Sequence, residues 1–460
     1  MRPRAYNPRP VSDSKRKRPP EATRRPETAV PVPAVRHLGV RVLLALAVVY
    51  AVVRGLSYAR TWRGLDYYQF WVVGQAAARS GAGADVYSEE ERRRIGADVL
   101  LGLTAEDHSD RLAAAASRRK VLETYSTPFL YTLTGTLASG RYDTDHLGFV
   151  LVSLACGIGG VLALCHRLRY PPLASASAIV ALTELYAPWR SDLRVGNVNG
   201  IQLGLLAGVL GVLGLRGRPW RDVSAGAILG TAVAFKPNLA FVAVLMAVAW
   251  ALDRRFATLR RASAGFALAV TGAFAASSIF FGGPRCWASW ISALRSMPGE
   301  IIGVRIGNFS LAHLVGDAAG VKIAPVLALL LLAASLSVLA LGRERGRTGN
   351  GAASSDEFVP LGVGCLVALL SSPLVWVHYF VLAIPLALWL LRPAGDEAGG
   401  WVDARRLLAG IAVVLLATRP LELIVGQGRP ALAAATANAG ALMLFGLALA
   451  ERLRRRAPSR

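Results

Sequence analysis

The chain has 460 residues, of which 54% are hydrophobic and only 18% are charged. About a quarter of the residues of a soluble globular domain are charged, so this composition is typical of a membrane protein. The formal net charge of +23 would suggest nucleic-acid binding in a soluble protein. The sequence contains no RNA-recognition motif, zinc finger or helix-turn-helix signature, so we expect no nucleic-acid partner.

The chain begins with a basic segment that cannot bury a core. Residues 1–36 are rich in Arg, Lys and Pro and are predicted to be a disordered tail. The first apolar run, 38–56, follows directly and has two interpretations, a cleaved signal peptide or an uncleaved first transmembrane helix. The long basic tail and the many later apolar runs favour the uncleaved helix.

Apolar runs then recur to the end of the chain, several of them near 20 residues long. A helix of roughly 20 residues crosses a hydrocarbon core about 30 Å thick, and backbone groups in lipid must be paired internally. We therefore predict an all-α polytopic membrane protein with about twelve spans. The predicted spans are 38–56, 147–166, 172–188, 198–215, 223–236, 238–252, 262–281, 324–342, 358–372, 374–391, 406–424 and 432–451.

The loops between these spans alternate in charge. If the N-terminus is cytoplasmic, every inner loop and both termini are rich in Arg, as the positive-inside rule requires. Residues 37–457 then form one transmembrane domain with a large first outer loop, 57–123, and a second outer loop, 282–323. The segment 124–139 would change this parity if it crossed the membrane, so we interpret it as re-entrant or interfacial.

Polar residues that are costly at membrane depth collect on the predicted outer face. Since charges and amides there are functional candidates by default, we expect them to line a cleft where the membrane meets water. The set comprises Asp66, Arg190, Asp192, Arg194, Asn197, Asn199, Lys236, Asn308, Trp376 and His378.

Most of these residues also have a purely structural interpretation. Asp66 follows the first span and is a candidate helix N-cap. The two arginines can reach lipid headgroups, and the asparagines at 197 and 199 can join helices that glycine lets pack closely. His378 can be an interfacial histidine with satisfied hydrogen bonds. Lys236 has no partner nearby in the sequence, so its structural interpretation is weaker.

An ordered series of short motifs on this face resembles glycosyltransferase family 87 of the GT-C superfamily, from about residue 38 to 451. Two positions depart from the family pattern: Asn197 replaces a glutamine, and Tyr379 replaces a histidine that often follows the last motif. The matching motifs are Asp66-Tyr67, the segment AAARSGAGADVY that ends at Tyr87, Tyr125 to Pro128, Gly196-Asn197-Val198-Asn199, Lys236-Pro237, Asn308 to Leu311, Ser372-Pro373 and Trp376 to His378.

The resemblance implies a GT-C-type fold and a membrane glycosyltransferase that uses a polyprenyl-phosphate sugar. Mannose is the first candidate for the sugar, and an arabinofuranosyl donor of the same type is the alternative. The acceptor would be a glycolipid or cell-wall glycan on the outer side of the plasma membrane, with both termini in the cytoplasm.

The chemistry of an inverting transfer assigns provisional roles. A carboxylate must take the acceptor proton, and Asp66 is the candidate. The departing lipid phosphate needs cationic or hydrogen-bonding groups, for which Lys236 and His378 are candidates with the arginines at 190 and 194 as helpers. Trp376 and Tyr67 are candidates for stacking on sugar rings, and the three asparagines for substrate binding. We expect neither a metal nor another cofactor, because fixed positive charge can do this work and no dense carboxylate cluster is present.

Two functions from other classes remain open at the level of sequence. A lipid or solute transporter would explain a lysine inside the membrane and helices broken at proline. Against it, no pair of matching halves is evident, and the polar residues gather at one face instead of the midplane. A non-catalytic membrane scaffold would leave Asp66, Lys236 and His378 unexplained.

Overall fold

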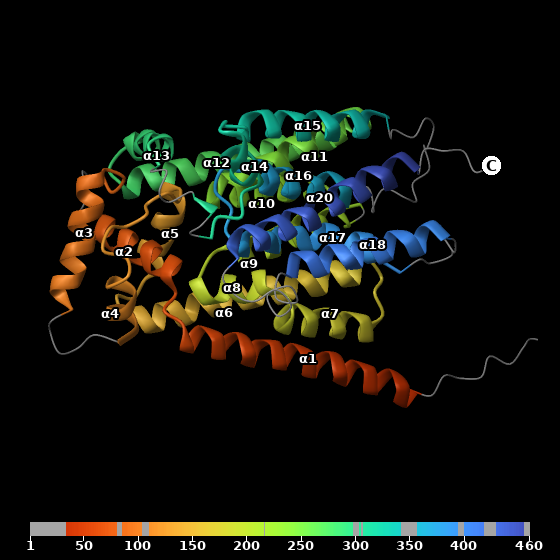
Figure 1. Ribbon diagram of the computed structural model, residues 1–460, viewed down its shortest axis with the longest axis horizontal. Coiled ribbons are helices and arrows are strands. Elements are labelled where there is room, and N and C mark those ends of the chain that lie inside the picture. Colours follow the sequence, from red (N-terminus) through yellow and green to blue (C-terminus); the bar gives the residue numbers. More distant parts are fainter. Residues whose placement is uncertain are drawn as a thin grey trace, which may run out of the picture.

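The computed structural model describes residues 34–80, 85–103, 110–215, 217–297, 303–304, 307–341, 357–393, 400–417 and 429–454. Within these ranges the chain forms helices joined by turns and contains no strand, as predicted (Figure 1). The predicted basic tail lies almost entirely outside the described residues, since the first helix begins at Ala34.

A helix occupies each of the predicted spans, and most of these helices run along the long axis of the molecule (Figure 1). They are α1 (Ala34–Thr61), α6 (Tyr142–Arg167), α7 (Pro172–Glu184), α9 (Asn199–Leu213), α10 (Arg221–Phe235), α11 (Ala240–Leu252), α12 (Phe256–Phe280), α15 (Ala324–Leu341), α16 (Phe358–Ser371), α17 (Ile384–Leu391), α18 (Gly400–Ala417) and α20 (Pro430–Arg454).

Five of the described helices are long and apolar enough to cross a membrane alone, namely α1, α6, α12, α15 and α20. A sixth candidate is the pair α8 (Ala187–Val195) and α9, which is bent by 117°. The other apolar helices are shorter than a full crossing, so the figure of about twelve spans stays a prediction.

Proline explains where several helices stop. The predicted span 172–188 ends early, at Glu184, because Pro188 has no backbone N–H to donate to the Glu184 carbonyl and lies in the first turn of the separate helix α8. Helix α10 likewise ends at Phe235, just before Lys236 and the short 3-10 helix η1 (Pro237–Leu239). The chain also leaves the α-helical conformation just before Pro373, since α16 ends at Ser371.

Glycine lets neighbouring helices approach closely. A Cβ atom added to Gly226 of α10 would lie 1.9 Å from the carbonyl oxygen of Ala262 in α12, and one added to Gly265 would lie 2.0 Å from that of Val223. Helices α6 and α9 meet in the same way at Gly204. The glycine-rich apolar stretches therefore serve helix packing.

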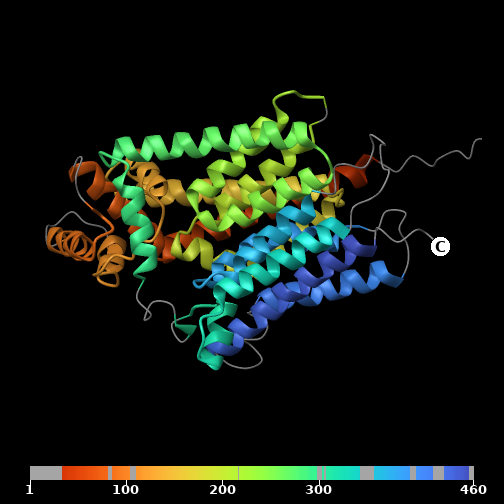
Figure 2. The same cartoon turned by 90° about the horizontal axis from the view of Figure 1, so that it is seen from above.

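The predicted outer loops form a second, smaller helical layer at one end of the bundle. It contains α2 (Leu65–Ser80), α3 (Glu89–Gly102), α4 (Asp110–Ala116), α5 (Pro128–Leu137) and α13 (Arg285–Arg295), and Figure 2 shows α13 lying across the end of the bundle. The indole nitrogen of Trp290 donates to the Tyr125 carbonyl at 3.1 Å, which joins the second outer loop to the segment 124–139. With ten residues, α5 is about 15 Å long and too short to span.

The loops predicted to be cytoplasmic converge at the opposite end. Arg255 before α12 pairs with Glu357 before α16 at 2.9 Å. Glu451 near the end of α20 pairs with Arg392 at 2.9 Å and Arg405 at 3.1 Å. Helix α1 also begins and α20 ends at this end (Figure 1). The two sets of loops thus occupy opposite ends of the bundle, while their assignment to the two sides of the membrane stays a prediction.

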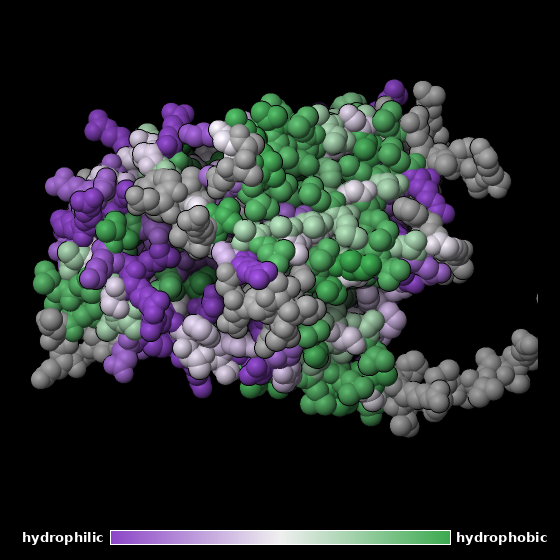
Figure 3. All heavy atoms as spheres, viewed as in Figure 1, coloured by the Kyte–Doolittle hydropathy of each residue, from purple (hydrophilic) through white to green (hydrophobic). Residues whose placement is uncertain are grey.

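The surface follows the same division. Hydrophilic residues gather at the end formed by α2 to α5, whereas the flank of the bundle is largely apolar on the face shown in Figure 3. An apolar flank between polar ends is what a protein in a bilayer presents to lipid.

Candidate active site

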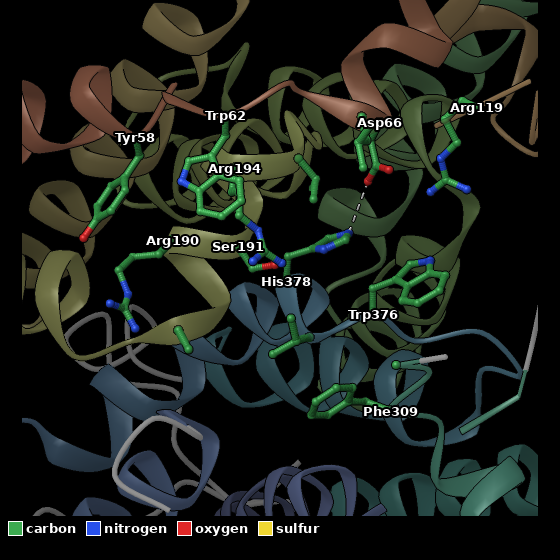
Figure 4. A pocket seen from close by; sticks show the side chains of 15 residues that line it. Tyr58, Trp62, Asp66, Arg119, Arg190, Ser191, Arg194, Phe309, Trp376 and His378 are labelled. Carbon is green, nitrogen blue, oxygen red and sulfur yellow. Dashed lines mark ion pairs between the residues drawn. The ribbon is translucent and has the colours of Figure 1, made fainter. Parts of the chain in front are cut away.

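A cavity of about 530 Å³ lies where the smaller helical layer meets the end of the bundle (Figure 4). Its walls come from the end of α1, the start of α2, one face of α8, the segment before α14 (Leu311–Ala319) and the start of the 3-10 helix η4 (Val377–Ala383). We call it the polar cavity. Its lining residues are Tyr58, Trp62, Leu65, Asp66, Arg119, Ala187, Arg190, Ser191, Arg194, Val195, Gly307, Phe309, Trp376, Val377 and His378.

Asp66 is the carboxylate of this cavity. It is the second residue of α2, so it does not occupy the N-cap position. Its Oδ2 accepts a hydrogen bond of 2.7 Å from Nδ2 of Asn197, and Nε2 of His378 lies 3.6 Å from the same oxygen. Figure 4 shows Asp66 and His378 facing one another across the cavity. Three segments that are far apart in sequence therefore meet at one carboxylate.

Burial gives this carboxylate a raised pKa. The side chain is 16% exposed, and desolvation raises its pKa above the usual range of an aspartate. The hydrogen bond from Asn197 opposes this shift most strongly, followed by the charge of Arg119. A carboxylate with a raised pKa binds a proton more readily, which suits a general base.

The turn between α8 and α9 fixes the amide that holds Asp66. Gly196 ends α8 with φ +69°, and a Cβ atom there would lie 2.7 Å from Cβ of Tyr67. The fully buried Asp192 accepts hydrogen bonds from Nδ2 of Asn199 at 2.8 Å and from the backbone N–H of Gly200 at 2.9 Å.

Asn199 in turn orients Asn197. Its Nδ2 also donates to Oδ1 of Asn197 at 3.1 Å, and the N–H of Val198 donates to the same oxygen at 2.8 Å. With Oδ1 occupied by these donors, the amino group of Asn197 is left to face Asp66. The sequence predicts Asp192 on this face without indicating a role, and the structure makes it the anchor of the turn.

Three arginines give the cavity a positive field. Arg119, Arg190 and Arg194 line it, against the single lining carboxylate. The guanidinium of Arg194 lies over the ring of Trp62, 5.0 Å from its centroid, and Arg119 pairs with Glu123. Nε of Arg190 is buried and has no hydrogen-bond partner among the described residues. Such a set of guanidinium groups suits a phosphate.

Arg119 was not among the predicted site residues. It stands in the basic stretch SRRK of the first outer loop, where nothing local distinguishes it from its neighbours. Only the fold of that loop, which brings residue 119 beside α2, identifies it.

Asn308 supports the cavity without lining it. Its Nδ2 donates to the carbonyl of Pro373 at 2.9 Å, and its Oδ1 accepts from the backbone N–H of Val375, also at 2.9 Å. The asparagine thereby holds the segment that leads into Trp376 and His378, both of which do line the cavity.

Two predicted residues lie behind the cavity wall. Nζ of Lys236 is 3.3 Å from the ring centroid of Tyr379 and 3.4 Å from Oδ1 of Asn197, so it contacts Asn197 from behind the cavity wall. Tyr67 is buried against Phe149, with ring centroids 4.8 Å apart. Neither residue is among those that line the cavity.

No three His, Cys, Asp or Glu side chains of the described residues are grouped so that they could hold a metal ion. The expectation that the protein needs no metal stays a prediction, as does the role of each candidate residue.

Comparison with known proteins decides the family. The profile of glycosyltransferase family 87 matches residues 124–373, which is more than half of the chain. The chain belongs to glycosyltransferase family 87. No curated protein and no solved structure gave a significant match.

Membership in glycosyltransferase family 87 makes this protein a membrane glycosyltransferase and confirms the resemblance found in the sequence. The matched range contains α8, the Asn197 turn and Lys236, whereas Asp66 and His378 lie outside it. The structure joins the two parts, because Asn197 within the match holds Asp66 outside it.

Proposed function

We propose that the protein moves a sugar, with mannose as our first candidate, from a polyprenyl-phosphate donor to a hydroxyl group of an extracytoplasmic glycolipid or cell-wall glycan, with inversion at the anomeric carbon. One observation carries the proposal: a lone carboxylate faces three guanidinium groups in a cavity at the end of an apolar bundle. A base and an anion site are what this transfer requires, and the bundle gives access to a lipid-linked substrate.

The proposed reaction is a single displacement. Asp66 removes the proton of the acceptor hydroxyl as its oxygen attacks the anomeric carbon. The bond between that carbon and the phosphate oxygen breaks, and its electron pair leaves with the phosphate. The products are the glycosylated acceptor and polyprenyl phosphate, with the proton on Asp66 until solvent takes it.

The departing phosphate gains negative charge, so the arginines matter most at this stage. We propose that Arg190 and Arg194 bind the phosphate, because both line the cavity and the buried Nε of Arg190 has no partner. We propose that His378 contacts the phosphate as well, because it lines the same cavity and its Nε2 lies 3.6 Å from Oδ2 of Asp66. Lys236 then acts indirectly, by holding Oδ1 of Asn197.

The aromatic residues of the wall are proposed to bind the sugar. Trp62 and Trp376 both line the cavity and offer flat faces to a ring (Figure 4). In this account Trp376 keeps the role predicted for it, while the buried Tyr67 supports the wall from behind.

The proposal is tested by supplying the donor directly. Membranes that contain the protein are incubated with radiolabelled polyprenyl-phosphate mannose and, separately, with polyprenyl-phosphate arabinose, and label is followed into lipid and glycan fractions. We expect transfer from the mannose donor, which is absent from membranes lacking the protein. Transfer from the arabinose donor alone would replace the sugar in our proposal. Transfer from neither donor, but from a nucleotide sugar, would overturn it.

A further inference from the structure

A second cavity, of about 260 Å³, opens beside the polar cavity and has the opposite chemistry. We call it the side groove. It lies between α6, α7, α17 and α18, and residues of its wall include Ala181, Leu182, Tyr186, Ile384, Leu388 and Val414. The mechanism proposed above makes no use of it.

On two walls, residues that are close in sequence line the side groove and the polar cavity in turn. Tyr186 lines the side groove, and the next residue, Ala187, lines the polar cavity. On the other wall, His378 faces the polar cavity and Ile384 faces the side groove, with only η4 between them. Helix α8 begins at this junction and contacts both α7 and α18. A molecule seated in one cavity is therefore within reach of the other.

The wall of the side groove offers no free hydrogen-bonding side chain. All of its lining residues are apolar apart from Tyr186, whose hydroxyl donates to the carbonyl of Phe380 at 2.7 Å. Water in such a space would find no partners, whereas a hydrocarbon chain gains from every apolar group it covers.

We propose that the side groove binds the first part of the polyprenyl chain of the sugar donor. This inference rests on the proposed function, because it takes the donor phosphate to lie at Arg190 and Arg194. Arg190 follows Tyr186 by four residues, about one helical turn. A chain attached directly to that phosphate therefore starts at the mouth of the side groove. The acyl chains of a glycolipid acceptor would be separated from the reacting hydroxyl by the glycan, which fits this short distance less well.

The test fills the side groove without disturbing the core. Ala181 lines the groove and is itself exposed, so Ala181→Trp places an indole in the groove and displaces no buried residue. The matched control is Val180→Trp, because Val180 is the adjacent residue of α7, is 40% exposed and does not line the groove.

We expect Ala181→Trp to raise KM for a long-chain polyprenyl-phosphate sugar by about tenfold or more, since each lost methylene contact weakens binding. The kcat at saturating donor, and the use of an analogue with a single isoprene unit, should stay as in the wild type. Val180→Trp should match the wild type throughout. Equal effects of the two tryptophans would overturn the proposal, and so would a raised KM for the acceptor instead of the donor.

A second readout does not depend on turnover. Purified protein is irradiated with polyprenyl phosphate that carries a diazirine near the phosphate end of its chain. We expect labelled peptides from α7 or α17 in the wild type and in Val180→Trp, and loss of that label in Ala181→Trp. Label in these peptides from a protein that transfers no sugar would refute the proposed function and still support the groove. Label elsewhere only would refute the groove.

Discussion

The pKa of Asp66 sets the expected pH dependence. Burial raises that pKa, and a base acts only when ionised, so kcat/KM should be high above the raised pKa and fall as the pH drops through it. The acid limb should therefore lie above the value of about 3.9 for an ordinary aspartate. The measurement is kcat/KM for the lipid-linked donor between about pH 4 and pH 8. An unchanged rate across this range would remove Asp66 as the titrating base.

Asn197 allows a sharper form of the same experiment. Its hydrogen bond stabilises the ionised carboxylate and lowers the pKa, so Asn197→Ala should move the acid limb to higher pH. A mutation that only weakened the fold would lower activity at every pH without moving the limb. A limb that stays in place, or moves to lower pH, would contradict the assigned contact.

Arg190 is predicted to bind the donor phosphate. Hydrogen bonds to charged groups are worth about 1.5–3 kcal/mol, so Arg190→Gln should weaken donor use by roughly 10- to 100-fold. The measurement is kcat/KM for the donor, with Arg218→Gln as control, because Arg218 is exposed and does not line the polar cavity. Equal activity of the two variants would exclude Arg190 from phosphate binding.

For single residues, the sequence predicted well which end of the molecule a residue occupies. It predicted less well where the side chain of that residue points. Asp66, Arg190, Trp376 and His378 were predicted on one face and line one cavity. Lys236 was predicted on the same face but lies behind Asn197. Hydropathy and loop charge place a residue along the membrane normal, whereas the direction of its side chain depends on tertiary packing.

Among the elements, the bent pair of α8 and α9 controls the site. Asp192 holds the bend by accepting from two donors. In Asp192→Asn one oxygen becomes an amino group facing a donor, which should cost about 1–3 kcal/mol and loosen Asn197. We expect a lower thermal midpoint together with lower turnover. The control is Asp222→Asn. Asp222 is also buried, but it pairs with Arg221 in the first turn of α10, at the end of that helix that is remote from Lys236. If turnover falls equally in both variants, the bend has no special role.

The bend also marks the limit of prediction for the elements. The apolar runs correctly predicted a helix at every span, because the hydropathy of a run can be read from the run alone. The polar helix α8 was not predicted: its first two residues were assigned to the preceding span and the others to an outer loop, although Pro188 was a signal for a break. The αL conformation of Gly196 and its contact with Tyr67 depend on α2, which is distant in sequence.

In the whole molecule, the loops are divided between the two ends of the bundle. Which end faces the cytoplasm can be tested by labelling. Glu90 in α3 and Asp403 in α18 are exposed residues that belong to predicted outer and inner segments. We expect a membrane-impermeant thiol reagent to label Glu90→Cys in intact cells, but to label Asp403→Cys only after permeabilisation. The wild type provides the baseline, as its cysteines are buried or half-buried. Labelling of Asp403→Cys in intact cells would invert the topology.

The central claim is that Asp66 is the base of a polyprenyl-phosphate-dependent sugar transfer, and the most direct measurement is the turnover of purified Asp66→Asn beside that of the wild type. Asparagine keeps the size of the side chain but cannot take the acceptor proton, so we expect a loss of about 10²–10⁴-fold in kcat, close to that of Asp66→Ala. Thermal unfolding of each variant shows that it is folded. Near-normal sugar transfer by a folded Asp66→Asn protein would contradict the account.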